Sequence, residues 1–461
     1  MKFGLKKLGP IKDANIELGD LTIICGKNNC GKTYLTHSLY SFLATIQRSF
    51  VFQMNEINAQ YFDDCYKEAA CSINTALIWE KFNTRLVDAM KNFKEEIPFF
   101  LTISPSALHN DLTISAIMED CDYNKFKEIQ RIAKFQVTEK CIIHVSKNAQ
   151  SANLDINIEN TGERLPRKEN LRKMFNVVCS IFFNQIFPDA FSLTGERSGI
   201  SLFADSIADF SRKMENLSLS VSKIKRRIQI VKDAGVSNQS FSFPVEKELA
   251  FFQNLRKICK RTSYISKEHP KLLFLADQLS GGHYNFDDQL GIQYIPENTE
   301  VSLTLSECSS SVKSLVEFNF YLRHCAKKNQ ILMIDEPELN LHPANQRKLA
   351  RLLAQLVNVG IRVFITTHSD YIIREFNTLI QLKQDKSYIA KIKQAEGYSD
   401  SELLDASRIR AYVAKQQDDG VVFEKAPITQ EAGITISTLD DVIDKMNQIQ
   451  DAIIWGGEDH V

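Results

Sequence analysis

The sequence lacks long apolar runs, closely spaced cysteine pairs and an overall charge. No stretch approaches the roughly 18 to 20 apolar residues of a membrane-spanning helix, and Met1 to Leu18 has no apolar signal-peptide centre. Ten cysteines are scattered from Cys25 to Cys325 without a C-x-x-C pair, which argues against a zinc site or a disulfide framework. We therefore expect a cytoplasmic protein with reduced thiols and no membrane partner.

The net charge of −1 provides no global field that would attract nucleic acid. DNA contact would have to come from local basic stretches, of which residues 164–173, 223–232 and 256–271 are candidates. The same runs also suit solvated helix faces, and this alternative stays open. With 461 residues the chain is too long for one ordinary core, so two or three lobes are expected.

The strongest motif directly follows a short apolar run at residues 21–25, which is typical of a buried strand. Residues 26–33, Gly-Lys-Asn-Asn-Cys-Gly-Lys-Thr, match G-x-x-x-x-G-K-T, and a helical pattern follows. In this setting Lys32 reaches the β- and γ-phosphates of a nucleotide and Thr33 ligates Mg²⁺. ATP and Mg²⁺ are the expected cofactors. The predicted nucleotide-binding residues of the loop are Gly26, Asn28, Asn29, Cys30, Gly31, Lys32 and Thr33.

A second motif ends another apolar strand. Residues 331–334 are apolar and lead directly into Asp335, Glu336 and Pro337, which is a Walker B layout. Asp335 is expected to hold the Mg²⁺ ion, and Glu336 to polarise the attacking water as general base. An ordinary strand-end charge is the alternative, but stability alone explains paired acids at this position poorly.

One helix later, a further strand ends in Thr366-Thr367-His368-Ser369. His368 is expected to contact the γ-phosphate, with a purely structural histidine as the alternative. Ahead of the Walker B strand, Ser309-Ser310-Ser311-Val312-Lys313 leads into a helix. Serines at a helix start can serve simply as caps, but their place before Walker B suggests a further role.

A heptad seam precedes these serines. Its apolar residues alternate in spacings of four and three, which predicts a supercoiled helix roughly 45 Å long. They are Phe203, Ile207, Phe210, Met214, Leu217, Val221, Ile224, Ile228 and Val231. A second helix is expected to return through residues 245–255, giving an antiparallel helical arm. The alternative is a long core helix in an all-α lobe.

In this order, the motifs resemble the ABC-type ATPase heads of the Rad50, RecF and SMC group. Residues 334–343 and 366–373 are especially similar to compact ATPases of bacterial antiphage systems. These are the ATPase subunits of Septu and PARIS and the ATPase half of the OLD-family nucleases. The resemblance covers residues 1–50 and roughly 300–381, and the arm by topology only.

The resemblance implies an α/β ABC-type P-loop ATPase head with a short coiled-coil arm inserted between Walker A and the signature. Ser309, Ser310, Ser311 and Lys313 occupy the signature position and would contact the nucleotide held by a second copy. Serines replace the two signature glycines there. A homodimer or a higher even-numbered assembly is therefore implied. His368 matches the family's switch histidine, and Leu339-Asn340 matches its D-loop.

Residues 195–199 lie where the family's Q-loop is expected. Arg197 would reach nucleotide phosphate or the dimer partner, with a surface turn as the alternative. The expected domains are an N-terminal ATPase lobe with an insert (1–200), the helical arm (201–280), a C-terminal ATPase lobe (281–385) and a tail suited to partner binding (386–461). The tail ends in an amphipathic helix beginning near residue 437.

OLD-family nucleases carry a Toprim domain after the head. Here the residues after Ile380 show no strand-end Glu followed by a strand-end D-x-D. The expected function is an ATP-hydrolysing sensor and regulator of an antiphage complex, with a separate HNH or Toprim effector nuclease. The alternative is a RecF- or Rad50-like DNA repair ATPase that itself binds DNA. A transporter nucleotide-binding subunit fits least, because such subunits are shorter and keep a close LSGGQ signature.

Overall fold

The computed structural model describes residues 1–103, 111–128, 130–162, 165–183, 187–204 and 241–455. Most of the predicted heptad helix, residues 205–231, lies outside these ranges, so the coiled-coil arm stays a prediction. Within the described part of the chain, no helix combines the length and the apolar character needed to cross a membrane.

A mixed nine-stranded sheet forms the centre, in the order β5-β1-β2-β16-β15-β3-β14-β13-β9. From β15 to β9 every neighbouring pair is parallel, whereas β5, β1 and β2 pair antiparallel. The α/β class predicted from the sequence is confirmed. The strands are β1 (Lys2–Leu8), β2 (Ile11–Glu17), β3 (Leu21–Gly26), β5 (Thr113–Ile117), β9 (Ala190–Leu193), β13 (Ile331–Asp335), β14 (Arg362–Thr367), β15 (Ile409–Gln417) and β16 (Gly420–Lys425).

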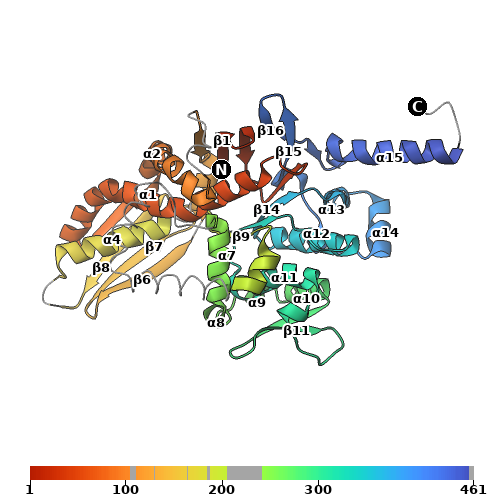
Figure 1. The fold of residues 1–461 in the computed structure, drawn as a ribbon. Helices are drawn as coiled ribbons and strands as arrows, with labels where there is room; N and C mark the ends of the chain where they lie inside the picture. The colour runs from red at the N-terminus through yellow and green to blue at the C-terminus, as the bar shows by residue number, and fades with distance from the viewer. Residues whose placement is uncertain (104–110, 129, 163–164, 184–186, 205–240, 456–461) are drawn as a thin grey trace, which may run out of the picture.

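Helices cover both faces of this sheet (Figure 1). Successive strand residues point to opposite faces, and accordingly Ile24 and Met333 join one buried core while Ile23 and Leu332 join the other. On the first face lie α1 (Lys32–Glu68) and α2 (Thr75–Leu101). On the second lie α12 (Pro343–Asn358) and α13 (Asp370–Gln381). Burial on both faces explains why the central strands read as continuous apolar runs.

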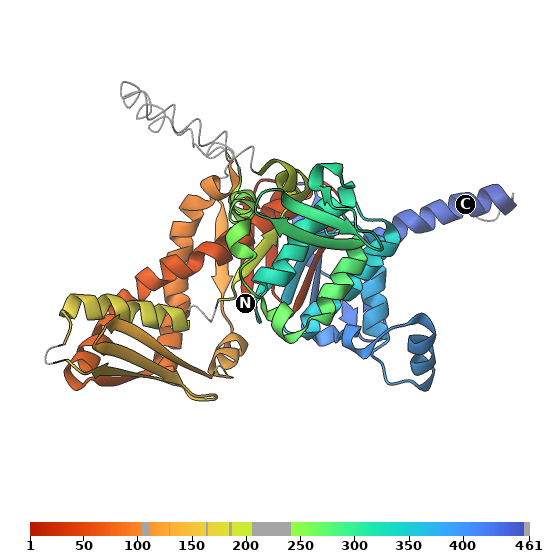
Figure 2. The same ribbon diagram turned by 90° about the horizontal axis from the view of Figure 1, so that it is seen from below.

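The insert after α1 carries its own four-stranded antiparallel sheet, in the order β4-β8-β7-β6. Within it, β7 and β8 form an antiparallel hairpin in which Cys141 pairs with Asn160. Figure 2 shows this sheet beside α1 and α4, at the end of the molecule opposite α15. The elements are β4 (Ala70–Asn74), α3 (Asp120–Glu128), β6 (Arg131–Thr138), β7 (Cys141–Lys147), β8 (Asn153–Asn160) and α4 (Lys168–Phe183).

A third group of elements surrounds the predicted signature. Its key helices are α7 (Phe243–Gln253) and α11 (Ser310–Phe320), which share a buried apolar cluster that includes Leu249 and Val316. The other elements are α8 (Leu255–Ile258), α9 (Tyr264–Glu268), α10 (Lys271–Ser280), β10 (Gly282–Asp287), β11 (Gly291–Pro296), β12 (Leu303–Thr304), η3 (Leu305–Glu307) and η4 (Tyr321–Cys325).

The C-terminal region corrects a predicted boundary. Sequence reasoning ended the ATPase core near residue 385, but β15 lies between β3 and β16 in the central sheet. Its residues Ile409 and Ala411 are fully buried there, so the sheet is incomplete without this segment. The remaining elements are α14 (Ser387–Glu396), η5 (Asp400–Glu402), η6 (Ala406–Arg408), β17 (Ile428–Thr429), β18 (Gly433–Ile434) and α15 (Ser437–Trp455). Helix α15 extends away from the body in both views (Figures 1 and 2).

Candidate functional site

The phosphate loop joins β3 to α1, and two of its glycines are required by close backbone approach. A Cβ at Gly26 would lie 2.7 Å from the Cβ of Ala414, and one at Gly31 would lie 2.9 Å from Pro10 and Ile11. Both residues also have positive φ. The two outer glycines of the motif thus let the loop turn tightly between β3 and α1.

The loop has the donors that a phosphate needs. Gly31 is the N-cap of α1 and has no side chain to satisfy the first-turn N–H groups, which are therefore available to an anion. The Lys32 ammonium is 6% exposed and folds over the loop, donating to the carbonyls of Gly26 and Lys27 at 2.9 Å each. A nucleotide phosphate fits between these donors.

A hydroxyl and a carboxylate face each other beside the loop. The Thr33 hydroxyl donates to Asp335 Oδ2 at 3.0 Å, and the buried Thr366 hydroxyl donates to the other oxygen of Asp335. Hard oxygen ligands of this kind suit Mg²⁺, which keeps waters and takes phosphate oxygens as further ligands. No cluster of three or more His, Cys, Asp or Glu able to hold a metal occurs among the described residues. The hydroxyl and the carboxylate suit Mg²⁺ by their ligand chemistry, with nucleotide oxygens and waters as the further ligands.

Glu336 and His368 lie at the same edge of the sheet. The Nδ1 atom of His368 is 3.7 Å from Glu336 Oε1 and 3.3 Å from Glu338 Oε1. The His368 side chain is 47% exposed and that of Glu336 31%, so both can be reached from solvent. Glu336 itself has a φ of 50°, in the left-handed region that non-glycine residues rarely adopt. Its conformation must be held by its surroundings.

Glu338 orients the histidine, a role that sequence reasoning did not assign. Its Oε1 accepts the Thr367 hydroxyl and the His368 backbone N–H, each at 2.8 Å. The carboxylate is buried and joins the end of β14 to the turn after β13. A signal for it existed, because a third acid follows Asp335 and Glu336 after only one proline.

His37 is a further group near the site that sequence reasoning missed. It lies one turn after Thr33 on α1, and its buried Nε2 has no hydrogen-bond partner among the described groups. Burial lowers the pKa of His37, although the charges of Asp335 and Glu196 act in the opposite direction. Burial thus favours the neutral form of this imidazole.

Among the described residues, no hydrogen bond joins the predicted signature residues to the phosphate loop, the strand-end acids or His368. Ser309 caps α11, its hydroxyl accepting from the Val312 N–H, and also contacts the Ser311 hydroxyl at 2.9 Å. Lys313 donates to the Ser306 carbonyl at 3.3 Å. Ser309 and Ser310 are exposed. The Val312 carbonyl accepts from the Tyr284 hydroxyl of β10 at 2.7 Å, which ties the turn to its own lobe and leaves the Ser309 and Ser310 side chains exposed.

Arg197 has a different setting from the phosphate contact expected from the sequence. Its side chain is 3% exposed, and it donates to the backbone carbonyls of Thr194, Ser314, Asp335 and Glu336. These bonds turn the guanidinium toward the interior of the chain. We therefore revise the expected role from nucleotide contact to positioning. The turn at residues 195–199 nevertheless lies beside Walker B, since a Cβ at Gly195 would be 3.9 Å from Asp335 Oδ2.

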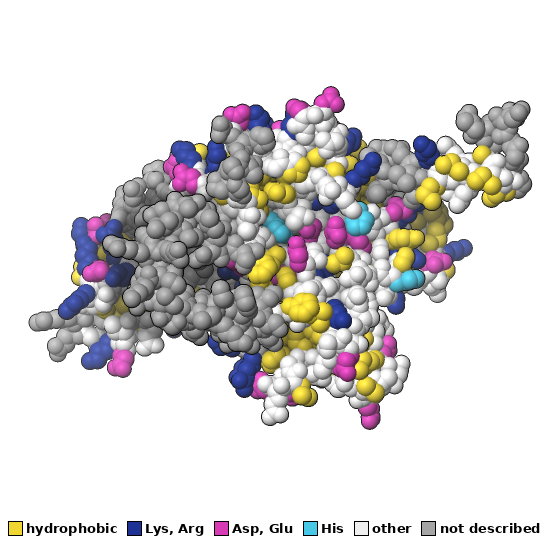
Figure 3. All heavy atoms as spheres, viewed as in Figure 1, with side chains coloured by type: hydrophobic (Ala, Val, Ile, Leu, Met, Phe, Trp, Pro, Cys, Tyr) yellow, Lys and Arg dark blue, Asp and Glu magenta, His cyan; other side chains and the backbone are white. Residues whose placement is uncertain are grey.

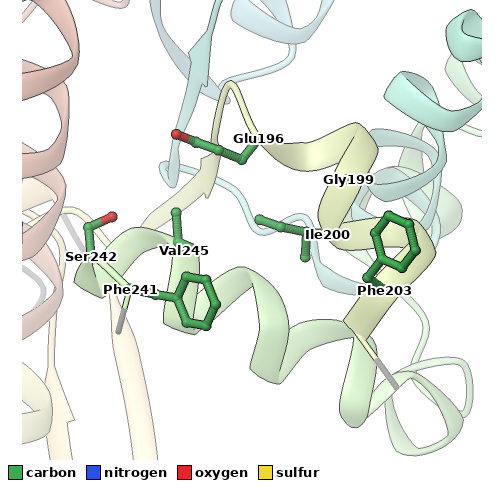
Figure 4. A pocket seen from close by; sticks show the side chains of 7 residues that line it. All are labelled: Glu196, Gly199, Ile200, Phe203, Phe241, Ser242 and Val245. Atoms are coloured by element: carbon green, nitrogen blue, oxygen red, sulfur yellow. The ribbon is translucent and has the colours of Figure 1, made fainter. Parts of the chain in front are cut away.

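A cavity of about 320 Å³ lies next to this turn. Figure 4 shows Glu196 at its rim, with the helical segment 197–204 on one side and α7 on the other. Its lining residues are Glu196, Gly199, Ile200, Phe203, Phe241, Ser242 and Val245. On the face seen in Figure 3, acidic side chains gather near the middle with histidines close by.

Parallel pairing of β3, β14 and β13 brings the phosphate loop, the strand-end acids and the histidine to one edge of the sheet, which is how P-loop ATPases are built. The sequence matches the AAA ATPase domain family over residues 1–373, and the chain belongs to that family. The chain is an ATP hydrolase, as the sequence predicted.

Individual relatives are distant. The Energy-coupling factor transporter ATP-binding protein EcfA1 of Methanospirillum hungatei JF-1 is 26% identical over 115 residues, which cover 24% of this chain and 42% of that protein. The chain thus spans less than half the length of this curated relative.

Similar solved structures include three SMC heads. The SMC head bound to the C-winged helix domain of ScpA is 10% identical, with a TM-score of 0.36 over 92% of this chain and 96% of that one. The SMC head domain from Thermotoga maritima is 10% identical, with a TM-score of 0.33 over 93% of this chain and 98% of that one. The SMC head domain with an extended coiled coil, bound to the C-terminal domain of ScpA from Pyrococcus furiosus, is 12% identical. Its TM-score is 0.32 over 97% of this chain and 98% of that one. TM-scores this low leave the assignment resting on the family match and the site.

Proposed function

We propose that the chain hydrolyses ATP at sites shared between two copies. Each site combines the phosphate loop and strand-end acids of one copy with the N-terminal turn of α11 from the other. One observation carries the proposal. Within a single chain Thr33 contacts Asp335 and Glu338 contacts His368, whereas the Ser309 and Ser310 side chains are exposed at the start of α11. The N-terminus of a helix suits the γ-phosphate of a bound nucleotide.

We call the phosphate loop, Asp335, Glu336, Glu338 and His368 the assembled half of the site, because a single chain brings them together. Each part of it has a role in this proposal. The loop N–H groups and Lys32 bind the phosphates, and Thr33 and Asp335 would hold Mg²⁺, whose charge stabilises the transferred phosphoryl group when bound. Glu336 orients a water and accepts its proton. His368, fixed by Glu338, hydrogen-bonds the γ-phosphate.

We further propose that the ATP cycle controls a separate effector in antiphage defence. The support is the resemblance of residues 334–343 and 366–373 to the ATPases of such systems. An exposed apolar face on α15, which includes Met446, Ile449 and Ile453, offers a surface for a partner protein. The effector is expected to be a nuclease encoded next to this chain.

The test is co-purification and DNA binding side by side. The tagged chain is expressed with its genomic neighbours, and we expect a nuclease to co-purify and to change activity on ATP addition. The pure chain is also titrated with duplex DNA at several salt concentrations. Tight binding by the chain alone, weakening steeply with salt, would favour a DNA repair ATPase instead.

A further inference from the structure

Arg197 joins three segments around the catalytic edge. From the loop after β9, its Nε donates to the Ser314 carbonyl on α11 at 3.1 Å, and its Nη1 and Nη2 donate to the carbonyls of Asp335 and Glu336, each at 2.7 Å. Nη1 also donates to the Thr194 carbonyl at 2.9 Å. One guanidinium thus ties the helix that begins with the signature serines to the end of the Walker B strand.

These bonds bear directly on Glu336. Its φ of 50° is a conformation that costs about 1 kcal/mol or more for a residue with a Cβ. The Glu336 N–H donates to the Thr366 carbonyl at 3.1 Å, and the Glu336 carbonyl accepts from Arg197. Both peptide groups around the residue are therefore held. This fixes the direction of the Cα–Cβ bond and places the carboxylate near His368.

A buried pair of carboxyl groups lies beside the guanidinium. Glu248 on α7 and Glu317 on α11 are both almost fully buried. Glu248 Oε2 accepts the Thr194 N–H at 3.0 Å. Among the described groups, Glu248 Oε1 and both oxygens of Glu317 have no hydrogen-bond partner. Buried carboxyl groups with so few hydrogen bonds need a nearby positive charge.

Arg197 is the positive charge that acts on both carboxyl groups. Burial raises the pKa of Glu317 well above its ordinary value, and the charge of Glu248 raises it further, while Arg197 acts in the opposite direction. Burial also raises the pKa of Glu248, and the charge of Arg197 again lowers it. The pair is therefore suited to balance the charge of the buried guanidinium.

We propose that Arg197 is a positioning residue for ATP hydrolysis, which holds Glu336 through its backbone, and that the buried carboxyl groups of Glu248 and Glu317 together serve as its counter-charge. The inference rests on the proposed role of Glu336 as general base. It also links α7, at the root of the predicted arm, and α11 to the site where water is activated (Figure 4 shows the loop beside α7).

The first test is Arg197→Lys, which keeps the charge but cannot bridge three segments. We expect ATP affinity and the melting temperature to change little, while kcat falls about 100-fold, as a misplacement of about 1 Å can cause. The change should fall on kcat and leave KM almost unchanged. A wild-type kcat, or a loss that follows the melting temperature and ATP affinity, would overturn the positioning role.

The Glu336→Gln background separates this inference from the proposed function. If Arg197 acts through Glu336, Arg197→Lys should lower the residual rate of Glu336→Gln no further. A further 100-fold loss in that background would mean that Arg197 acts elsewhere. If Glu336→Gln alone kept the wild-type rate, the base assignment would fail, and the effect of Arg197→Lys could still be measured.

The second test examines the carboxyl pair. Glu317→Gln and Glu248→Gln each leave one carboxylate, so each single variant should keep kcat and melting temperature close to wild type. The double variant removes the counter-charge of Arg197 and should lose both. Should either single variant be as damaging as the double, or the double harmless, a counter-charge shared by the two carboxyl groups is excluded. The single variants decide the matter even if the double variant does not fold.

Discussion

At the carboxyl edge of the central sheet, Thr33 and Asp335 meet at 3.0 Å and Glu338 holds His368 in place, whereas the serines that begin α11 bond only within their own turn. Asp335 and Glu338 are buried, whereas Thr33, His368 and the serines Ser309 and Ser310 are exposed. The contrast teaches that one chain brings the phosphate loop, the strand-end acids and the histidine to one edge, while the exposed serines of α11 make no described contact with them. A second copy that brings its own α11 would supply that contact.

Removing the anchor of the assembled half should have the largest effect. We expect Lys32→Ala to abolish ATP binding and turnover, because the ammonium is the one side-chain cation placed over the loop by the hydrogen bonds described above. Binding of a fluorescent ATP analogue and phosphate release are measured. Lys328→Ala, at an exposed lysine, serves as the control. Normal nucleotide affinity in Lys32→Ala would contradict the assignment of the phosphate loop as the ATP-binding part of the site.

Removing the base should separate binding from turnover. Glu336→Gln keeps the shape of the side chain, so ATP binding should persist while kcat falls roughly 10³-fold. We also expect the ATP-bound dimer to accumulate in light scattering, because hydrolysis no longer releases it. Glu431→Gln, at another exposed glutamate, is the matched control. A dimer that forms equally well without ATP would contradict the proposed cycle.

Blocking the exposed start of α11 should lower turnover, as the loss of Glu336 does, while leaving Glu336 itself unchanged. Ser310→Arg adds bulk at the helix start but spares the Ser309 cap, and we expect about a 100-fold loss of kcat with ATP affinity intact. Ser310→Ala, which adds no bulk, should cost far less. Turnover at the wild-type rate in Ser310→Arg would show that this turn stays free during the reaction.

The smallest effect is expected at the histidine. His368→Ala removes one hydrogen bond to the γ-phosphate, and the loss of one charged hydrogen bond predicts a roughly 10- to 100-fold lower kcat. Glu338→Gln should cause a smaller loss of the same kind, because an amide oxygen can still accept the His368 N–H. Kinetics at saturating ATP measure both. An effect of Glu338→Gln larger than that of His368→Ala would show that Glu338 does more than orient the histidine.

Local patterns were enough to predict the assembled half, since the phosphate loop and the Walker B acids each follow an apolar strand. The insertion of β15 between β3 and β16 was not predictable, because strand pairing across most of the chain leaves no local signal. The setting of Arg197 was missed for a similar reason. Its partners are backbone carbonyls from distant segments, and residue type does not reveal which carbonyls will be free.

Mixing two inactive variants tests the shared site most directly. Lys32→Ala lacks a working phosphate loop but keeps its α11, and Ser310→Arg has the reverse defect. In a two-fold dimer each copy gives the other the same surface, so a mixed dimer contains one intact site. We predict that neither variant alone turns over ATP at a substantial rate and that the mixture does. A mixture no more active than the sum of its parts would contradict a site shared between two copies.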